Sequence, residues 1–196
     1  HFEGGSYHGM FERGKRHGHG SLRSEPGRTE VNGASIQRYD GQWAEGQMCG
    51  EGKLIRHNGE TYEGMLRDGE YHGWGSLSTA ERRQIEGEFV GGVAEGRAKL
   101  QLANGDRYSG EMSSGLQHGQ GNCAYANGDH FEGSWVRGTR DGEGRCEFAH
   151  GVTYVGSWAG DNMEGNGTLT LPDGRVVRGT WVRGVIQGLA SLEVRG

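Results

Sequence analysis

The chain has 196 residues, which is enough for one ordinary domain or one repeat array. Its 41 glycines are about three times the usual share, and only 32% of residues are hydrophobic, so we expect a thin ordered sheet rather than a thick globular core. The net charge of −5 argues against a general nucleic-acid binder, which needs a basic face.

The N-terminal part of the chain departs from the regular pattern that follows it. Residues 7–196 form a series of sequence repeats, described below, and residues 1–6, with Gly4-Gly5, resemble the tail of another repeat before them. Because the sequence starts with His1 rather than Met, we expect a fragment of a longer chain. Nine extra residues within 23–38, around Pro26-Gly27, predict a lengthened surface turn.

A repeat of fixed length organises residues 7–196. The first interval between equivalent residues is 32, and the six that follow are all 23. A constant period of this size is typical of repeat architectures. If each start is position one, positions three and twelve are glycine in all eight repeats, and position fourteen is glycine or alanine. The repeats start at Tyr7, Tyr39, Tyr62, Ile85, Tyr108, Phe131, Tyr154 and Val177.

Each repeat is predicted to be one β-hairpin. Positions one, three and five alternate large, glycine, large, which is typical of a half-buried strand, and positions fourteen, sixteen and eighteen alternate in the same way. The glycines leave bare backbone on which aromatic rings can lie flat. We therefore predict an all-β fold, a linear single-layer array of antiparallel β-hairpin repeats that forms an elongated twisted rod with an aromatic-lined groove.

Two kinds of connection are predicted. Dipeptides such as Asn58-Gly59 and Asn127-Gly128 separate successive repeats and favour two-residue turns. Within the repeat, the glycines at positions eight and twelve, as in Gly46–Gly50 and Gly138–Gly142, are interpreted as the two ends of a longer loop.

The repeat resembles the MORN family (membrane occupation and recognition nexus). The second copy reads Tyr39-x-Gly41-x-Trp43-x-x-Gly46-x-x-x-Gly50-x-Gly52, which matches the family's unit at every fixed point. Departures are local: Ile85 and Val177 replace the first aromatic, Ala98 and Ala190 replace a glycine, and Gly160 comes one place early.

The resemblance implies an interaction module rather than one activity. Such arrays act as scaffolds in cytoskeletal and membrane-junction assemblies, and some are associated with acidic phosphoinositides. They also occur beside catalytic domains, including lysine methyltransferases and lipid kinases. A chain made only of repeats is most similar to the cytoskeletal scaffolds, such as those of protist parasites.

The large residues at positions one and five share one face by the period-two argument. Aromatic anchors dominate protein interfaces, so we predict a partner-binding groove there, although the same rings are also the only core. The predicted groove residues are Tyr39, Trp43, Tyr62, Trp135, Tyr154 and Trp158.

The last repeat is apolar where the others are polar. A terminal repeat is expected to be polar on its outer side. We therefore predict a homodimer, or a higher oligomer, joined through the C-terminal repeats; packing against residues beyond Gly196 is the alternative. The predicted interface residues are Trp181, Val185, Ile186, Leu189 and Leu192.

Arg13, Lys15 and Arg16 form the one dense basic loop. Such a loop attracts anionic lipid headgroups, so weak phosphoinositide binding is an alternative to a solvated loop.

Potential metal ligands and thiols are spread along the array. Position eleven carries His17, Cys49, His72 and His118 in different repeats, about 10 Å apart between neighbours, so only a dimer could bring them together around zinc. The widely spaced cysteines indicate reduced thiols of an intracellular protein, and Cys123 and Cys146 are predicted to be buried.

No constellation of nucleophile, base and orienting group emerges from the repeats, so we expect neither an enzyme nor a cofactor. The predicted function is a non-catalytic oligomeric scaffold of a cytoskeletal or membrane-junction assembly, cytoplasmic and associated with cytoskeleton or membrane. The alternatives are a phosphoinositide-binding membrane adaptor and the regulatory repeat segment of a larger enzyme.

Overall fold

The computed structural model describes residues 5–25, 30–31 and 34–193, which form strands and turns. No helix in these described residues is long and apolar enough to span a membrane. The chain divides into two compact units, residues 1–103 and residues 104–196, and each is described by itself.

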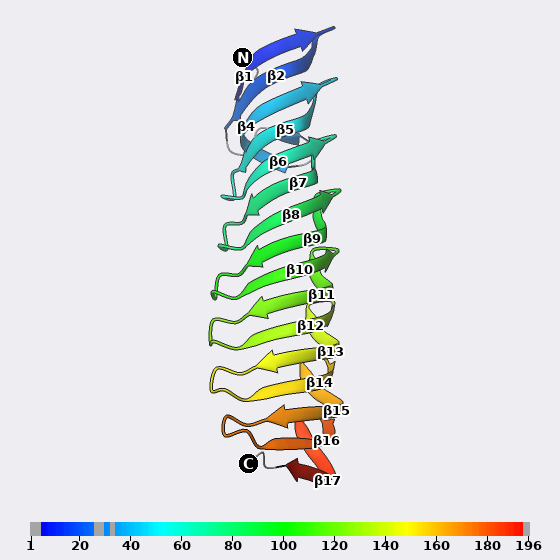
Figure 1. Cartoon of the computed structure of the whole chain (residues 1–196). Helices are drawn as coiled ribbons and strands as arrows, with labels where there is room; N and C mark the ends of the chain where they lie inside the picture. Colours follow the sequence, from blue (N-terminus) through cyan, green and yellow to red (C-terminus); the bar gives the residue numbers. More distant parts are fainter. Residues whose placement is uncertain (1–4, 26–29, 32–33, 194–196) are drawn as a thin grey trace. The chain divides into compact units, whose positions relative to one another are not determined.

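Unit 1 is an open antiparallel sheet in which hairpins follow one another in chain order (Figure 1). Strand β2 pairs directly with β4, so the array continues past the insertion between them. The sheet strands are β1 (Gly5–Glu12), β2 (Lys15–Ser24), β4 (Ala34–Ala44), β5 (Gln47–Arg56), β6 (Thr61–Arg67), β7 (Glu70–Ser78), β8 (Gln84–Val90) and β9 (Val93–Gln101).

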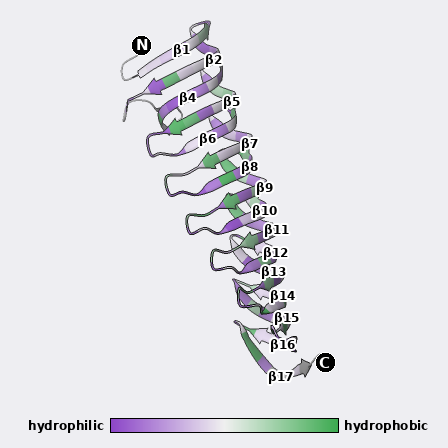
Figure 2. Cartoon of the chain, turned by 60° about the vertical axis from the view of Figure 1, so that its left-hand side comes forward, coloured by the Kyte–Doolittle hydropathy of each residue, from purple (hydrophilic) through white to green (hydrophobic). Residues whose placement is uncertain are grey.

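Unit 2 repeats the arrangement, and hydrophilic and hydrophobic segments alternate along its strands as in unit 1 (Figure 2). The predicted all-β array of antiparallel hairpins is confirmed in each unit. The strands are β10 (Arg107–Ser113), β11 (Leu116–Ala124), β12 (His130–Val136), β13 (Thr139–Glu147), β14 (Thr153–Ala159), β15 (Asn162–Thr170), β16 (Val176–Val182) and β17 (Val185–Glu193).

The ring at position one lies flat on a pair of glycines, as the sequence predicts. Gly41 and Gly52 face each other across β4 and β5. A Cβ on Gly41 would lie 2.6 Å from the Cα of Gly52, and a Cβ on Gly52 would meet the ring of Tyr39. The Tyr39 hydroxyl donates to the carbonyl oxygen of Gln42, three residues on, at 2.9 Å. The same hydrogen bond recurs from Tyr7, Tyr62, Tyr108 and Tyr154.

Within each unit, each repeat is also joined to the one before it. The Trp43 ring packs edge-on against Tyr7 of the preceding repeat, with centroids 5.5 Å apart, and its Nε1 donates to the carbonyl oxygen of Gly20 at 3.1 Å. The turn amide of Gly46 donates to the carbonyl oxygen of Arg16 at 3.0 Å. Equivalent turn amides bond to the preceding repeat in both units, so the core and the backbone hydrogen bonding run together from hairpin to hairpin.

The two turn types are the reverse of the sequence prediction. Within the repeat the chain reverses over two residues, Glu45 and Gly46, with φ values of 51° and 89°, as in type I′ hairpins. Between repeats, the amide of Gly59 donates to the carbonyl oxygen of Arg56 at 3.0 Å, and only Gly59 of the Asn-Gly pair has positive φ. This is the three-residue hairpin loop, a turn followed by one left-handed glycine.

The glycine at position twelve lies inside a strand and does not end a loop, so the predicted loops Gly46–Gly50 and Gly138–Gly142 are wrong. Gly50 belongs to β5 and has φ +56°, beside the register shift between Gly41 and Gln42. The register leaves Gly50 and Glu51 without partners on β4, so this β-bulge inserts two residues and bends the strand.

The insertion in the first repeat is more than the predicted surface turn. Part of it, β3 (Glu30–Val31), pairs with the first residues of β4. Ile36, also within the insertion, is fully buried, and its carbonyl oxygen accepts a hydrogen bond from the Ser24 hydroxyl. The remaining residues of the insertion, 26–29 and 32–33, and residues 1–4 of the predicted tail lie outside the described residues.

Where position one lacks a ring, the glycine at position fourteen is an alanine. Gly87 faces Ala98 in the repeat that starts with Ile85. A tyrosine in place of Ile85 would therefore meet the Ala98 methyl group, since the other rings of this kind lie directly over that site.

We expect Ile85→Tyr alone to destabilise the fold by about 1–3 kcal/mol through overpacking, and Ile85→Tyr with Ala98→Gly to recover most of that loss. The measurement is urea unfolding of the wild type, both single variants and the double variant. Single effects that simply add, with no coupling between the two sites, would contradict the ring–glycine explanation.

Candidate interaction surfaces

The six predicted groove residues share the ring-bearing face of their units, and the structure buries them. Unit 1 holds Tyr39, Trp43 and Tyr62, and unit 2 holds the other three, all between 0 and 4% exposed. They therefore form the core of the array. Direct contact between a partner and these rings stays a prediction. The unit 2 residues of this set are Trp135, Tyr154 and Trp158.

Side chains at position ten cover these rings, a role that the sequence prediction missed. The Tyr71 ring stacks on Tyr62 with centroids 3.9 Å apart. In unit 2 the Arg140 guanidinium lies 4.3 Å from the centre of a Trp158 ring and pairs with Asp161 at 3.0 Å. A partner on the ring-bearing face would meet these covering side chains first. Their signal in the sequence is a large side chain opposite position five, as at Arg16, Met48, Tyr71, Arg140 and Met163.

The C-terminal hairpin exposes apolar side chains next to a sheet edge. Val182 and Val185 face each other across β16 and β17, and they are 43% and 60% exposed. Of the predicted interface residues, Trp181 is buried and Ile186 is partly exposed, while the side chains of Leu189 and Leu192 lie outside the described part. The register of the described residues pairs β17 with β16 alone.

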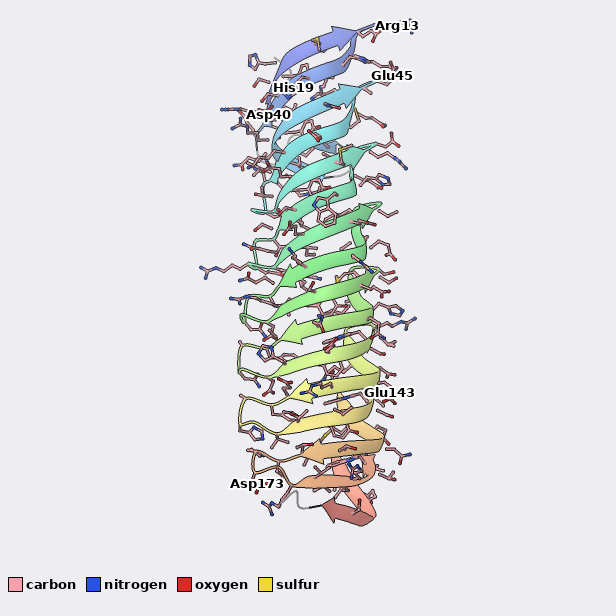
Figure 3. All side chains as sticks on the ribbon, viewed as in Figure 1. Arg13, His19, Asp40, Glu45, Glu143 and Asp173 are labelled. Carbon is pink, nitrogen blue, oxygen red and sulfur yellow. The ribbon has the colours of Figure 1, made fainter. Side chains whose placement is uncertain are left out.

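The predicted lipid-binding loop is largely engaged with its own protein. Lys15 pairs with Glu45 at 2.7 Å, and the Arg16 guanidinium lies 4.8 Å from the centre of a Trp43 ring. Burial lowers the pKa of Arg16 from its ordinary value. Arg13 projects at the turn end of the first hairpin, as Glu45 does at the second (Figure 3). Phosphoinositide binding by this loop stays a prediction.

Position eleven does not form a metal centre within the described residues, which contain no group of three or more His, Cys, Asp or Glu side chains able to hold one. His17 lies 3.3 Å from Glu12, Cys49 is partly buried, and His72 and His118 stand in other hairpins. A site bridged by a dimer stays a prediction.

Cys123 and Cys146 are buried free thiols, as predicted. Burial raises the pKa of each to about 11, so both stay protonated and unreactive near neutral pH.

A groove on the polar face of unit 1 was not predicted. It has a volume of about 1100 Å³ and crosses from β2 to β8. At one end His19 and Asp40 lie on neighbouring strands, 3.8 Å apart (Figure 3). Toward the other end lies Trp74, which is 56% exposed. Its signal in the sequence is a tryptophan at position thirteen, where the other repeats carry no tryptophan, tyrosine or phenylalanine.

The buried tyrosines make the fold sensitive to alkali. Burial raises the pKa of Tyr62, Tyr108 and Tyr154 to about 12, above the ordinary 10.0. Between these two values the unfolded chain gives up protons that the folded chain keeps. The stabilisation is therefore complete below pH 10 and is lost as the pH rises toward 12.

We expect the free energy of unfolding to fall steeply over that range, and tyrosinate absorbance to appear together with loss of β-sheet circular dichroism. Tyr62→Phe should be less stable near neutral pH, because the bond to Met65 is lost, but its stability should depend less on alkali. Free titration of all the tyrosines near pH 10 in the folded protein would refute the burial argument.

Solved structures with a resembling fold share little sequence with this chain. The TCP domain of Drosophila melanogaster SAS-4 (dCPAP), in complex with a proline-rich motif of Ana2 (dSTIL), is 14% identical over 74% of this chain and 85% of that chain, with a TM-score of 0.40. The TCP10 domain of Danio rerio CPAP, in complex with a STIL peptide, is 16% identical over 88% and 93%, with a TM-score of 0.30. Likeness at this level says nothing about what this chain binds. No curated protein matches the chain.

The MORN repeat family model matches seven segments that together span well over half of the chain. The predicted eighth repeat, from Val177, lies beyond the last match, where β16 and β17 form a hairpin with the same pairing as those before it. The matched segments are 7–27, 39–61, 62–78, 86–107, 108–130, 131–153 and 154–174. The chain therefore belongs to the MORN repeat family.

Proposed function

We propose that the chain is a non-catalytic scaffold of a cytoskeletal or membrane-junction assembly, and that two copies dimerise through their C-terminal hairpins. Family membership supports a repeat module that binds other proteins. The different roles of the two faces support the scaffold further. The ring-bearing face forms the core of the fold, and the polar face and the hairpin ends are left for partners.

The exposed pair of Val182 and Val185 is the observation that carries the dimer. Both side chains lie in register on the last hairpin, next to a strand that has one neighbour among the described residues. An open edge offers unpaired backbone groups, and two edges can add to each other across a two-fold axis. Apolar side chains beside that edge would be removed from water in the same contact.

We expect the chain to sediment as a dimer and Val185→Glu to sediment as a monomer. Val185 is the sharper site, because Ile186 is partly buried and its replacement would also disturb the hairpin. The matched control is Leu116→Glu, which changes an exposed residue at the same repeat position in an earlier hairpin of unit 2 and should leave the dimer intact.

Circular dichroism would check that both variants stay folded. A Val185→Glu, Ile186→Glu variant that is folded and still dimeric would place the contact elsewhere and overturn this arrangement. Monomeric wild-type chain at high concentration would do the same.

A further inference from the structure

Trp74 is the one tryptophan that does not pack in the core of its unit. Trp43, Trp135, Trp158 and Trp181 are between 2 and 6% exposed on the ring-bearing faces, whereas Trp74 lies on the polar face of β7 and is 56% exposed. Its indole has no ring contact or hydrogen bond with any described residue. An exposed aromatic side chain without a structural task is typical of a binding surface.

The nearest neighbours of Trp74 on this face are a thioether and carboxylates. Trp74 faces Glu88 across β7 and β8, and Met65 faces Glu51 across β6 and β5. Met65 and Trp74 belong to the same hairpin, where a Cβ on Gly73 would lie 3.4 Å from that of Met65. Glu51, Met65, Trp74 and Glu88 thus form one row across four strands, with a carboxylate at each end.

A second row of side chains lies beside the first on the polar face, and it has a serine between two of its carboxylates. Lys53 pairs with Glu63 at 2.9 Å. The next residues along the row are Ser76 and then Glu86, so a serine stands between two carboxylates. Within the described residues, the carboxylates of Glu51, Glu86 and Glu88 form no ion pair or hydrogen bond. Lys99 faces Glu86 in register but does not form a close ion pair with it.

The groove therefore combines an open indole with carboxylates that form no close ion pair with any described residue. Its lining carries four carboxylates against two cationic side chains, Arg38 and Lys53, which are both paired with carboxylates of the lining. The remaining charge gathers at the end that holds Trp74. A cation over an indole face is attracted by the ring, and more strongly where carboxylates share it.

We infer that this groove binds a basic peptide segment of a protein partner and places an arginine or lysine side chain on the indole of Trp74. The groove crosses six strands, which is about 24 Å and fits an extended segment of about seven residues. This inference rests on the proposed scaffold function, and it names basic peptide segments as the class of partner that the scaffold binds. The site uses residues of β2 to β8 and none of the C-terminal hairpin.

The test uses the full chain and a fluorescein-labelled glycine–serine peptide of about seven residues that carries a pair of arginines. A twin peptide with citrulline in place of arginine keeps the shape and removes the charge. Fluorescence anisotropy should show binding of the arginine peptide, at least about tenfold weaker binding of the citrulline peptide, and a similar loss in Trp74→Ala.

A charge variant, Glu51→Gln with Glu86→Gln, should weaken binding of the arginine peptide without changing the fold. Its matched control is Glu132→Gln, at the same repeat position as Glu86 but in unit 2, which should bind like the wild type. Each site residue is on the polar face, so unchanged urea unfolding would separate loss of binding from loss of folding.

Equal binding of the arginine and citrulline peptides, unchanged affinity in folded Trp74→Ala, or no binding by the wild type would each overturn the inference. Repeating the titration in Val185→Glu distinguishes the two proposals. If the wild type binds the peptide but never dimerises, the peptide site is supported and the dimer is rejected. If the wild type dimerises but does not bind the peptide, the dimer is supported and the peptide site is rejected.

Discussion

The contact between a flat aromatic ring and a pair of facing glycines determines the rest of this structure. A sheet one layer thick has no second layer to cover its apolar face, so each repeat covers that face with its own rings. Tyr39 can lie down only because Gly41 and Gly52 have no side chains beneath it, and its hydroxyl then reaches the carbonyl oxygen of Gln42. The pairing of Ile85 with Ala98 follows the same constraint, because a smaller side chain above leaves room for a methyl group below.

The alternation in the sequence predicts the strands, but it predicts neither the turn types nor the register between strands. The hairpins and the role of the glycines follow from alternation alone. The sequence prediction of the turns is wrong because Asn-Gly fits both two-residue and three-residue loops, and because Glu45 takes a left-handed conformation that its residue type does not signal. The bulge at Gly50 depends on cross-strand register, which one strand's sequence does not contain.

The two faces of the sheet have different freedom to vary. On the ring-bearing face Trp43 contacts Tyr7 of the preceding repeat and Tyr39 of its own, so replacing Trp43 affects two hairpins at once. On the polar face a side chain contacts mainly its cross-strand neighbours, and a change such as the indole of Trp74 is accepted without disturbing the core. Repeat-to-repeat differences on the polar face therefore disturb the fold less than differences on the ring-bearing face. The sequence does not predict the burial of Ile36, because the insertion has no counterpart in the other repeats, and it does not predict a role for Trp74, because the other repeats carry no tryptophan at that position.

The backward direction of the bonds between hairpins has an evolutionary consequence. The turn amide of Gly46 and the indole of Trp43 both bond to carbonyl groups of the hairpin immediately before, and the same holds for Gly138 and Trp135 in unit 2. A newly duplicated unit thus finds its acceptors on whichever unit precedes it. Whole units can therefore be added or removed while the turn amide of each remaining unit keeps an acceptor, so this bonding constrains the period of the chain but not its length.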